Sequence, residues 1–275
     1  MRKWLKRLFI LLVILVILSL YSYFKLDITY YEVVNSKIPN SFNNYKILLL
    51  SDLHDRDLKD KINEICKEEK PDIIVMSGDM ANYNGYNKFF ELVKSLNKYD
   101  IYYVTGNHEQ DMNSKVYDKF IDELDKYVNI LDNEMVEIYE GEDHINLYGL
   151  NYPLRYYSKK GMYNLTDDNI SARIGKADKK EYNILLTHNP LYYDTYSEWG
   201  SDLTLSGHVH GGIVRIPFAG GLLSPDFTFF PKYSEGKNKI NDMDLIISRG
   251  LGNGGQIKVR INNHSEVVIV KLEVK

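Results

Sequence analysis

The sequence predicts an α+β fold of the α/β/β/α type, in which two mixed β-sheets pack face to face and helices cover their outer surfaces. In the first half of the chain, short apolar runs alternate with helical patterns, which indicates parallel strands joined by crossover helices. The second half contains mostly strand patterns, which favours packing of one sheet on another. No internal repeat or linker divides residues 26–275, so we expect one domain there.

The individual elements follow from local patterns. Residues 28–34 are rich in β-branched and aromatic side chains and end before Pro39. Residues 47–50, 73–76 and 101–104 are short continuous apolar runs, typical of strands buried on both faces. Each of these three runs precedes apolar side chains at helical spacing, beginning with Leu58, Phe89 and Val116 respectively. Further strands are expected at residues 135–139, 145–150, 183–186, 203–205, 245–247, 257–261 and 267–274.

The composition is that of a globular chain with an acidic body. Of 275 residues, 44% are apolar, which excludes wholesale disorder. The net charge is −4, and residues 1–24 carry four basic side chains and no acid, so the remainder carries −8. An acidic body argues against a binder of duplex nucleic acid, which needs a basic face for the phosphates. Cys66 is the only cysteine, which excludes an intrachain disulfide and a cysteine-rich zinc site.

An apolar N-terminal segment predicts a membrane anchor in residues 1–25. Residues 8–24 contain no charge, and seventeen helical residues span about 26 Å, at the short end for a membrane-crossing helix. Because the basic residues precede this run, the N-terminus is expected in the cytoplasm and residues 26–275 outside it. Aromatic side chains typical of membrane interfaces flank the run, namely Trp4, Tyr21, Tyr23 and Phe24.

A cleaved signal peptide and a buried core helix are the two alternatives for this segment. A cleaved signal peptide has an apolar region of similar length, but no small-x-small cleavage site follows Leu18. A buried core helix would be expected to show a polar face, which the unbroken run from Leu8 to Leu18 lacks. The uncleaved anchor is the preferred interpretation.

Polar side chains directly follow the expected strands. Ligands in α/β folds gather at the carboxyl ends of strands, so these segments are expected to converge on one site. Five of the seven histidines lie in them. The segments are Asp52-Leu53-His54, Gly78-Asp79, Gly106-Asn107-His108-Glu109, Thr187-His188 and Gly207-His208-Val209-His210.

The residue types in these segments suit a site for two metal ions. In Asp-x-His and His-x-His at a strand end, alternate side chains project to one side, so each pair can point into one metal cluster. Mixed imidazole and carboxylate ligands favour Mn, Fe or Zn over Ca or Mg. Two ions about 3.5–4 Å apart need a bridging anion, and a lone aspartate after a glycine can approach both.

These five ordered motifs resemble those of the calcineurin-like metallophosphoesterases. The resemblance runs from about Ile28 to the C-terminus and extends to Gly211-Gly212 and to Ser248-Arg249-Gly250-Leu251-Gly252. These extra segments resemble a membrane-anchored or exported bacterial branch whose signature reads Gly-His-Thr-His-Gly-Gly-Gln. Val209 and Ile213 replace the Thr and Gln of that signature, which bears on substrate preference rather than on metal binding.

The resemblance implies a role for each motif residue. Asp52, His54 and His210 would bind one divalent ion, and Asn107, His188 and His208 the other, with Asp79 bridging both. A metal-bridging hydroxide would attack phosphorus in line while the ions neutralise the phosphoryl oxygens. His108 would steady the phosphate and protonate the leaving oxygen. Asn82 stands where the family often has an acid that can orient the catalytic histidine.

Two arginines are further candidates for contact with substrate. Arg56 comes two residues after His54, and Arg249 lies in a glycine-rich segment. Each guanidinium could meet a phosphate or carboxylate of the substrate. The alternative for both is a solvated or salt-bridged arginine, which is common and contributes little to stability.

The sequence therefore predicts a membrane-anchored, extracytoplasmic enzyme that hydrolyses a phosphomonoester, phosphodiester or pyrophosphate with two divalent ions (Mn, Fe or Zn). Because the first expected ligand follows the anchor closely, the favoured substrate is a small phosphorylated molecule, a lipid headgroup or a wall polymer in the envelope or at the membrane surface. One alternative is a metal- or phosphate-binding scaffold without catalysis on the same fold. Another is a barrel metallohydrolase, but such barrels usually carry their His-x-His pair on the first strand.

Overall fold

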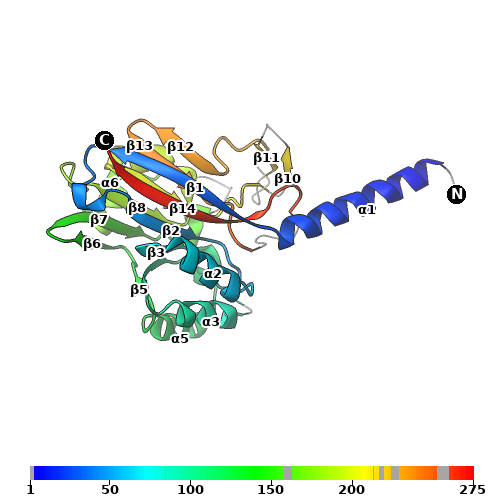
Figure 1. Ribbon diagram of the computed structural model, residues 1–275, viewed down its shortest axis with the longest axis horizontal. Helices are drawn as coiled ribbons and strands as arrows, with labels where there is room; N and C mark the ends of the chain where they lie inside the picture. The colour runs from blue at the N-terminus through cyan, green and yellow to red at the C-terminus, as the bar shows by residue number, and fades with distance from the viewer. Residues whose placement is uncertain are drawn as a thin grey trace.

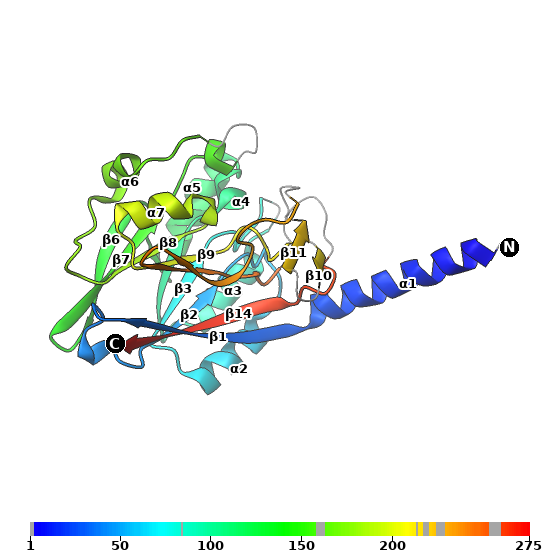
Figure 2. The same cartoon turned by 90° about the horizontal axis from the view of Figure 1, so that it is seen from above.

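Two six-stranded sheets face each other, and a long N-terminal helix extends from one side of the body that they form (Figure 1). This computed structural model describes residues 3–83, 85–157, 163–212, 214–216, 220–223, 229–252 and 260–275. Helices cover the outer surfaces of both sheets (Figure 2). The predicted α/β/β/α arrangement is thereby confirmed.

The first sheet has the order β1-β14-β2-β3-β4-β5. The strand β14 is parallel to β1 and antiparallel to β2, and β2 to β5 are parallel to one another. The strands are β1 (Leu26–Asn35), β14 (Ser265–Val274), β2 (Lys46–Leu50), β3 (Ile73–Ser77), β4 (Asp100–Val104) and β5 (Asn129–Ile130).

The second sheet has the order β12-β13-β9-β8-β7-β6, with a parallel centre and antiparallel strands at both edges. Its strands are β12 (Gly236–Ile240), β13 (Met243–Ile247), β9 (Leu203–Ser206), β8 (Asn183–Thr187), β7 (Asp143–Leu150) and β6 (Glu134–Glu140). A separate two-stranded sheet consists of β10 (Val214–Ile216) and β11 (Gly220–Leu223).

The helices pack on the outer faces of the two sheets. The first sheet is covered by α2 (Lys59–Glu69), α3 (Asn87–Ser95) and α5 (Ser114–Leu124), and the second by α6 (Asp167–Ile174) and α7 (Tyr193–Trp199). A single-turn helix, α4 (Asn107–Gln110), begins within the Gly-Asn-His-Glu motif. Short 3-10 turns lie at Asn40–Phe42, Leu154–Tyr157 and Pro190–Tyr192.

The continuous apolar runs are explained by burial on both faces. In β2, Ile47 and Leu49 pack between the two sheets, whereas Leu48 and Leu50 pack against the helices, because successive side chains point to opposite faces. All four are fully buried. A strand in this position needs apolar residues throughout, which is why it shows no alternation.

Most expected strands are confirmed, with shifts of one or two residues at their ends. The strand expected at 257–261 lies mostly outside the described residues, although Ile261 forms an isolated bridge with Val214. The elements β5, β10, β11, β12, α4, α6 and α7 were not expected. They are short or polar, so their local patterns are weak and their pairing depends on tertiary contacts.

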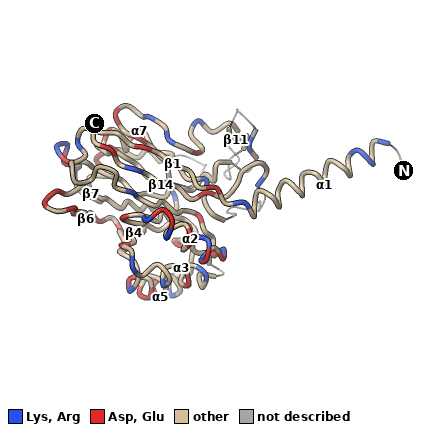
Figure 3. Tube along the Cα trace, viewed as in Figure 1, with Lys and Arg blue, Asp and Glu red and all other residues tan. Residues whose placement is uncertain are grey.

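The N-terminal helix α1 (Lys3–Phe24) extends away from the body, and nearly all of its side chains are exposed. It is long and apolar enough to cross a membrane. Figure 3 shows basic residues at its N-terminal end and no acidic residue along it.

Candidate metal centre

The five predicted segments meet where the carboxyl ends of the parallel strands in one sheet lie next to those in the other sheet. In the first sheet, Asp52 and Asp79 follow the parallel strands β2 and β3. In the second, His188 and His208 follow the parallel strands β8 and β9. The His188 Nδ1–H donates to the backbone oxygen of Ser77, the last residue of β3, at 2.6 Å, which joins the two edges directly.

The backbone at these segments adopts an uncommon conformation. Asp52, His54, Asp79, His208 and His210 all have positive φ, between 50° and 69°. A non-glycine residue in this left-handed region costs about 1–2 kcal/mol, and such residues concentrate at functional sites. These left-handed turns lie where side chains two positions apart in the chain, such as those of Asp52 and His54, enter one cluster.

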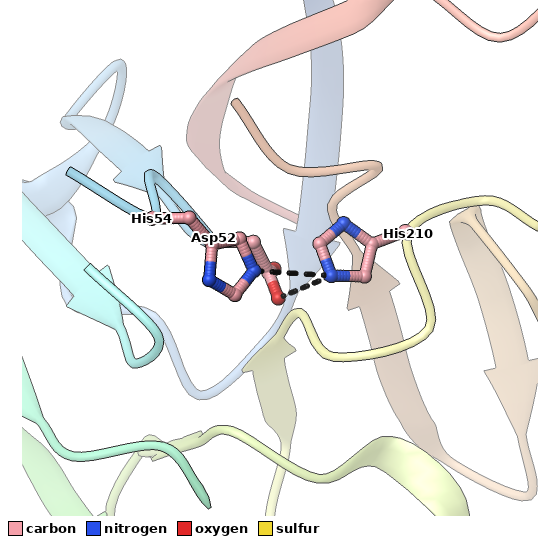
Figure 4. Close-up of side chains that lie close together, drawn as sticks. All are labelled: Asp52, His54 and His210. Atoms are coloured by element: carbon pink, nitrogen blue, oxygen red, sulfur yellow. Dashed lines mark hydrogen bonds and ion pairs between the residues drawn. The ribbon is translucent and has the colours of Figure 1, made fainter. Parts of the chain in front are cut away.

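The first ligand group consists of Asp52, His54 and His210 (Figure 4). The His210 Nε2 lies 3.2 Å from Asp52 Oδ1 and 3.4 Å from His54 Nε2. Burial lowers the pKa of His54 to about 4 and that of His210 well below its usual value. Both imidazoles are therefore neutral at pH 7, the form that binds metals.

The second ligand group is built around Asp79. Its carboxylate lies with His188 and His208 in one group and with His54 and His108 in another. The Asp79 Oδ2 is 3.2 Å from His188 Nε2 and 3.9 Å from His108 Nε2, and Oδ1 accepts the backbone N–H of His108 at 2.8 Å. Asp79 therefore stands between the ligands predicted for the two ions.

The donor set fits cations at this position. Because His188 Nδ1 donates to a carbonyl, its Nε2 lone pair faces the carboxylate of Asp79, and two acceptors at 3.2 Å need a proton or a metal ion between them. Without a metal, burial lowers the pKa of His188 but Asp79 raises it to about 9. The Asn107 Oδ1 is buried and has no hydrogen-bond partner among the described residues. The His188 Nε2 and the Asn107 Oδ1 therefore both belong to predicted ligands and lack a hydrogen-bond donor among the described residues.

Glu109 of the Gly-Asn-His-Glu motif holds two of the turns together, a role the sequence left unassigned. Its Oε2 accepts the backbone N–H groups of Asp79 at 3.0 Å and Gly106 at 2.8 Å, and its Oε1 accepts that of Ala81 at 2.8 Å. The side chain is fully buried. Burial and Asp79 raise its pKa to about 7, whereas the three N–H donors favour its ionised form.

Asn82 contacts a different histidine from the one expected. Its Nδ2 donates to the backbone oxygen of His54 at 2.9 Å, and its Oδ1 lies 3.0 Å from His54 Nδ1. An amide oxygen only accepts, so His54 Nδ1 carries the proton and Nε2 keeps its lone pair toward the cluster. In this structure Asn82 orients His54, a predicted ligand, rather than His108.

Two further side chains at the centre were not found from the sequence. Arg260 is buried and donates to the backbone oxygens of Arg249 and Gly252, and its Nη2 lies 3.2 Å from His210 Nδ1. The Tyr157 ring packs against His188 and His208, with ring centroids 5.9 and 5.2 Å apart. Neither residue lies in a motif, so no local signal identified them.

The two predicted substrate arginines are engaged elsewhere. Arg56 donates to Leu251 O and Ser265 Oγ, both at 2.7 Å. Arg249 forms ion pairs with Asp27 and Glu266, both at 3.2 Å, and with Glu235 at 3.6 Å. The structure therefore does not bring their guanidinium groups into the metal cluster, and their contact with substrate stays a prediction.

Comparison with known proteins identifies the family. The model of the calcineurin-like phosphoesterase domain matches residues 45–212, more than half of the chain. The chain belongs to the calcineurin-like phosphoesterase family. The uncharacterized metallophosphoesterase YkuE of Bacillus subtilis is 26% identical over 250 residues, 82% of this chain and 79% of that protein. The phosphodiesterase YaeI of Escherichia coli is 24% identical over 241 residues, 83% of this chain and 82% of that protein.

A bovine relative, named a transmembrane protein with metallophosphoesterase domain, is 30% identical over 220 residues, 73% of this chain and 48% of that protein. The family and the clustered ligand groups together support metal-dependent hydrolysis of a phosphoester by this calcineurin-like phosphoesterase. The protein is a hydrolase, and the aspartate and histidine ligands predicted for its metals lie together at the carboxyl ends of the parallel strands of the two sheets.

Proposed function

We propose that this phosphoesterase uses two divalent ions, one held by Asp52, His54 and His210 and the other by Asn107, His188 and His208, with Asp79 shared between them. The observation that carries the proposal is the position of Asp79, which groups with His54 on one side and with His188 and His208 on the other. When bound at these residues, two ions of the Mn, Fe or Zn type would supply a hydroxide nucleophile and neutralise the charge of the phosphoryl oxygens.

The protein's own residues orient and protonate the substrate. His108 is partly exposed and lies beside Asp79 and His54, with its ring centroid 4.7 Å from that of His54. From this position its imidazolium would donate a proton to the leaving oxygen as the bond from that oxygen to phosphorus breaks and the bond from phosphorus to the oxygen of the hydroxide forms. Asn82 and Glu109 hold the surrounding turns in place through the hydrogen bonds described above.

The N-terminal helix supports membrane anchoring by residues 1–25, with residues 26–275 forming the catalytic domain. The basic residues at the start of α1 favour a cytoplasmic N-terminus and an extracytoplasmic catalytic domain. The substrate is a phosphorylated molecule of the envelope or the membrane surface, either a small molecule or a lipid. An acidic body disfavours duplex nucleic acid as a substrate.

Activity and metal content of the full-length protein in detergent test the proposal. Wild type is compared with Asp79→Asn, His108→Ala and, as a matched control, His144→Ala, which alters a histidine outside the cluster. The assay measures Mn-dependent hydrolysis of bis(p-nitrophenyl) phosphate and of p-nitrophenyl phosphate. Bound metal is determined by mass spectrometry.

We expect wild type to bind two ions and to hydrolyse at least one of the esters. Asp79→Asn loses bound metal and activity together. His108→Ala keeps its metal but loses activity by about 10²–10⁴-fold, the usual contribution of a general acid, and His144→Ala behaves as wild type. A folded, metal-loaded wild type that hydrolyses neither ester, or a fully active His108→Ala, contradicts the proposal.

A further inference from the structure

The membrane helix and the catalytic body are joined without a linker. Phe24 ends α1, Leu26 begins β1, and Lys25 between them donates its N–H to Tyr21 O at 3.0 Å, continuing the helical pattern. All ten residues of β1 pair with β14. The direction of the helix relative to the body is therefore set by a hydrogen-bonded sheet rather than by a flexible segment.

Two side chains of the catalytic body, from Arg56 and His264, contact the end of the helix. The Arg56 guanidinium lies 4.1 Å from the centre of the Tyr23 ring and donates to the Tyr23 backbone oxygen. The His264 ring meets Tyr21 edge-on, with centroids 5.3 Å apart. Because Arg56 stands two residues after the predicted ligand His54, the end of the helix is tied to the turn that carries the metal ligands.

The topology places the helix at the same edge of the first sheet as the metal centre. Because β14 is antiparallel to β2 and parallel to β1, the N-terminal ends of β1 and β14 lie beside the carboxyl end of β2. That carboxyl end leads directly into Asp52 and His54. Figures 1 and 2 show α1 leaving from the side of the body on which β10 and β11 lie.

Large aromatic side chains are exposed on this same side. Phe229 and Phe230 are 68% and 62% exposed, and Phe24 at the end of α1 is 64% exposed. Phe229 forms a bridge with Leu223 of β11, and the Phe230 N–H donates to Leu222 O at 3.0 Å, so both are attached to the two-stranded sheet. Adjacent exposed aromatic side chains of this kind mark a contact surface.

We propose that the edge carrying the metal centre lies against the bilayer, that Phe229 and Phe230 enter its interfacial layer beside α1, and that the substrate is a phosphate ester in a lipid headgroup. This inference rests on the proposed function. The 22 residues of α1 extend about 33 Å, enough to cross a hydrocarbon core of about 30 Å and to place Tyr21, Tyr23 and Phe24 at the interface.

The bilayer is the expected partner of this aromatic surface because the surface adjoins the end of α1. The helix docks rigidly and its end is at the interface, so the adjoining aromatic pair lies close to the plane of the headgroups. A phosphate at that depth reaches the metal centre without leaving the membrane. Hydrolysis breaks the phosphorus–oxygen bond of the ester and adds water across it, leaving the lipid part in the bilayer.

The position of the aromatic pair is tested independently of activity. A nitroxide is attached to Phe230→Cys in the full-length protein, reconstituted into phosphatidylcholine–phosphatidylglycerol vesicles. The control site is Tyr139→Cys, because Tyr139 is 60% exposed and lies at the opposite end of the second sheet. Native Cys66 is buried and does not compete for the label.

We expect the nitroxide at position 230 to be relaxed by oxygen and protected from a water-soluble nickel chelate, and the nitroxide at position 139 to show the reverse. Equal exposure of the two sites to the nickel chelate overturns the proposed orientation. This outcome would not contradict the proposed function, because nitroxide accessibility is measured without catalysis.

The substrate class is tested with vesicles that contain phosphatidylglycerol as a diester or phosphatidic acid as a monoester. Wild type is expected to hydrolyse one of them. Phe229→Ser/Phe230→Ser is expected to lower that rate about tenfold, as for the loss of two interfacial aromatic contacts, with hydrolysis of soluble bis(p-nitrophenyl) phosphate unchanged. Tyr139→Ser is the control and retains both rates.

Hydrolysis of the soluble ester without hydrolysis of either lipid, or an unchanged lipid rate in the double variant, overturns the inference. Failure of wild type on the soluble esters as well would instead contradict the proposed function. The two failures are therefore distinguishable.

Discussion

The side chain of Asn82 forms a two-point contact with His54, through its Nδ2 to the His54 backbone oxygen at 2.9 Å and its Oδ1 to Nδ1 at 3.0 Å. The contact selects the tautomer in which His54 Nε2 is free to bind a metal. Partners of this kind orient metal-binding histidines and raise their basicity.

Removing this contact is expected to weaken metal binding. Asn82→Ala should lower the affinity of the centre for Mn by about 10–100-fold, the usual effect of losing such a partner, whereas Asn82→Asp keeps the acceptor and should retain most of the affinity. Titration of the metal-free protein followed by calorimetry measures both. Equal affinity of wild type and Asn82→Ala would show that His54 needs no such partner.

Metal binding should release a proton near neutral pH. Without metal, Asp79 raises the pKa of His188 to about 9 despite burial, so His188 is protonated at pH 7.5. A metal ion requires the neutral imidazole and displaces that proton. Affinity should therefore rise with pH up to about 9 and level off above it.

Calorimetric titration with Mn in two buffers of different ionisation enthalpy measures this release. We expect about one proton per chain from this histidine at pH 7.5 and none above pH 10. A binding enthalpy that is the same in both buffers at pH 7.5 would show that His188 is already neutral.

The loss of the Glu109 carboxylate should destabilise the fold as well as the centre. Glutamine offers one oxygen, and its amide group would face a backbone N–H, so at least one buried donor loses its partner. Glu109→Gln should lower the free energy of unfolding by about 1–3 kcal/mol. Urea unfolding at pH 8.5, where the carboxylate is ionised, measures the change.

Glu64→Gln serves as the control, because Glu64 is exposed on α2. It should change the free energy of unfolding by less than about 0.5 kcal/mol. A Glu109→Gln variant as stable as this control would mean that the three N–H groups find other partners.

Gly250 is a point of close approach to Asp52, a proposed metal ligand. It has a φ of +73°, and a Cβ there would lie 2.7 Å from Asp52 Cβ. Gly250→Ala should therefore displace Asp52 and weaken Mn binding by about tenfold or more. Gly141→Ala is the matched control, since Gly141 has a φ of +65° and no atom of the described residues lies within 4 Å of the added Cβ.

Both glycine variants have the same positive-φ cost of about 1–2 kcal/mol in stability. Only Gly250→Ala should also lose metal affinity. Thermal unfolding and Mn titration of the two variants separate the effects, and equal affinities would argue against displacement of Asp52.

The sequence alone determined the layered fold and the candidate ligands because both depend on local patterns. Continuous apolar runs such as residues 47–50 indicate strands buried on both faces, and polar motifs such as Asp52-Leu53-His54 stand directly after them. The order of these motifs along the chain carried the resemblance to the family that the domain match confirms. Composition also excluded a cysteine-rich metal site.

The tertiary structure alone decided which side chains meet. Arg260 reaches His210 across fifty positions of sequence, and Glu109 joins the turns at Asp79 and Gly106, although neither contact has a local signature. Asn82 was expected to orient His108 but contacts His54. The left-handed turns at His54 and Asp79 set the directions of the His54 and Asn82 side chains. For Arg56 and Arg249 the sequence left open both a substrate contact and a salt-bridged arginine, and only the structure shows that nearby carbonyls and carboxylates bind them. Such contacts depend on the packing of distant segments, which a linear pattern does not encode.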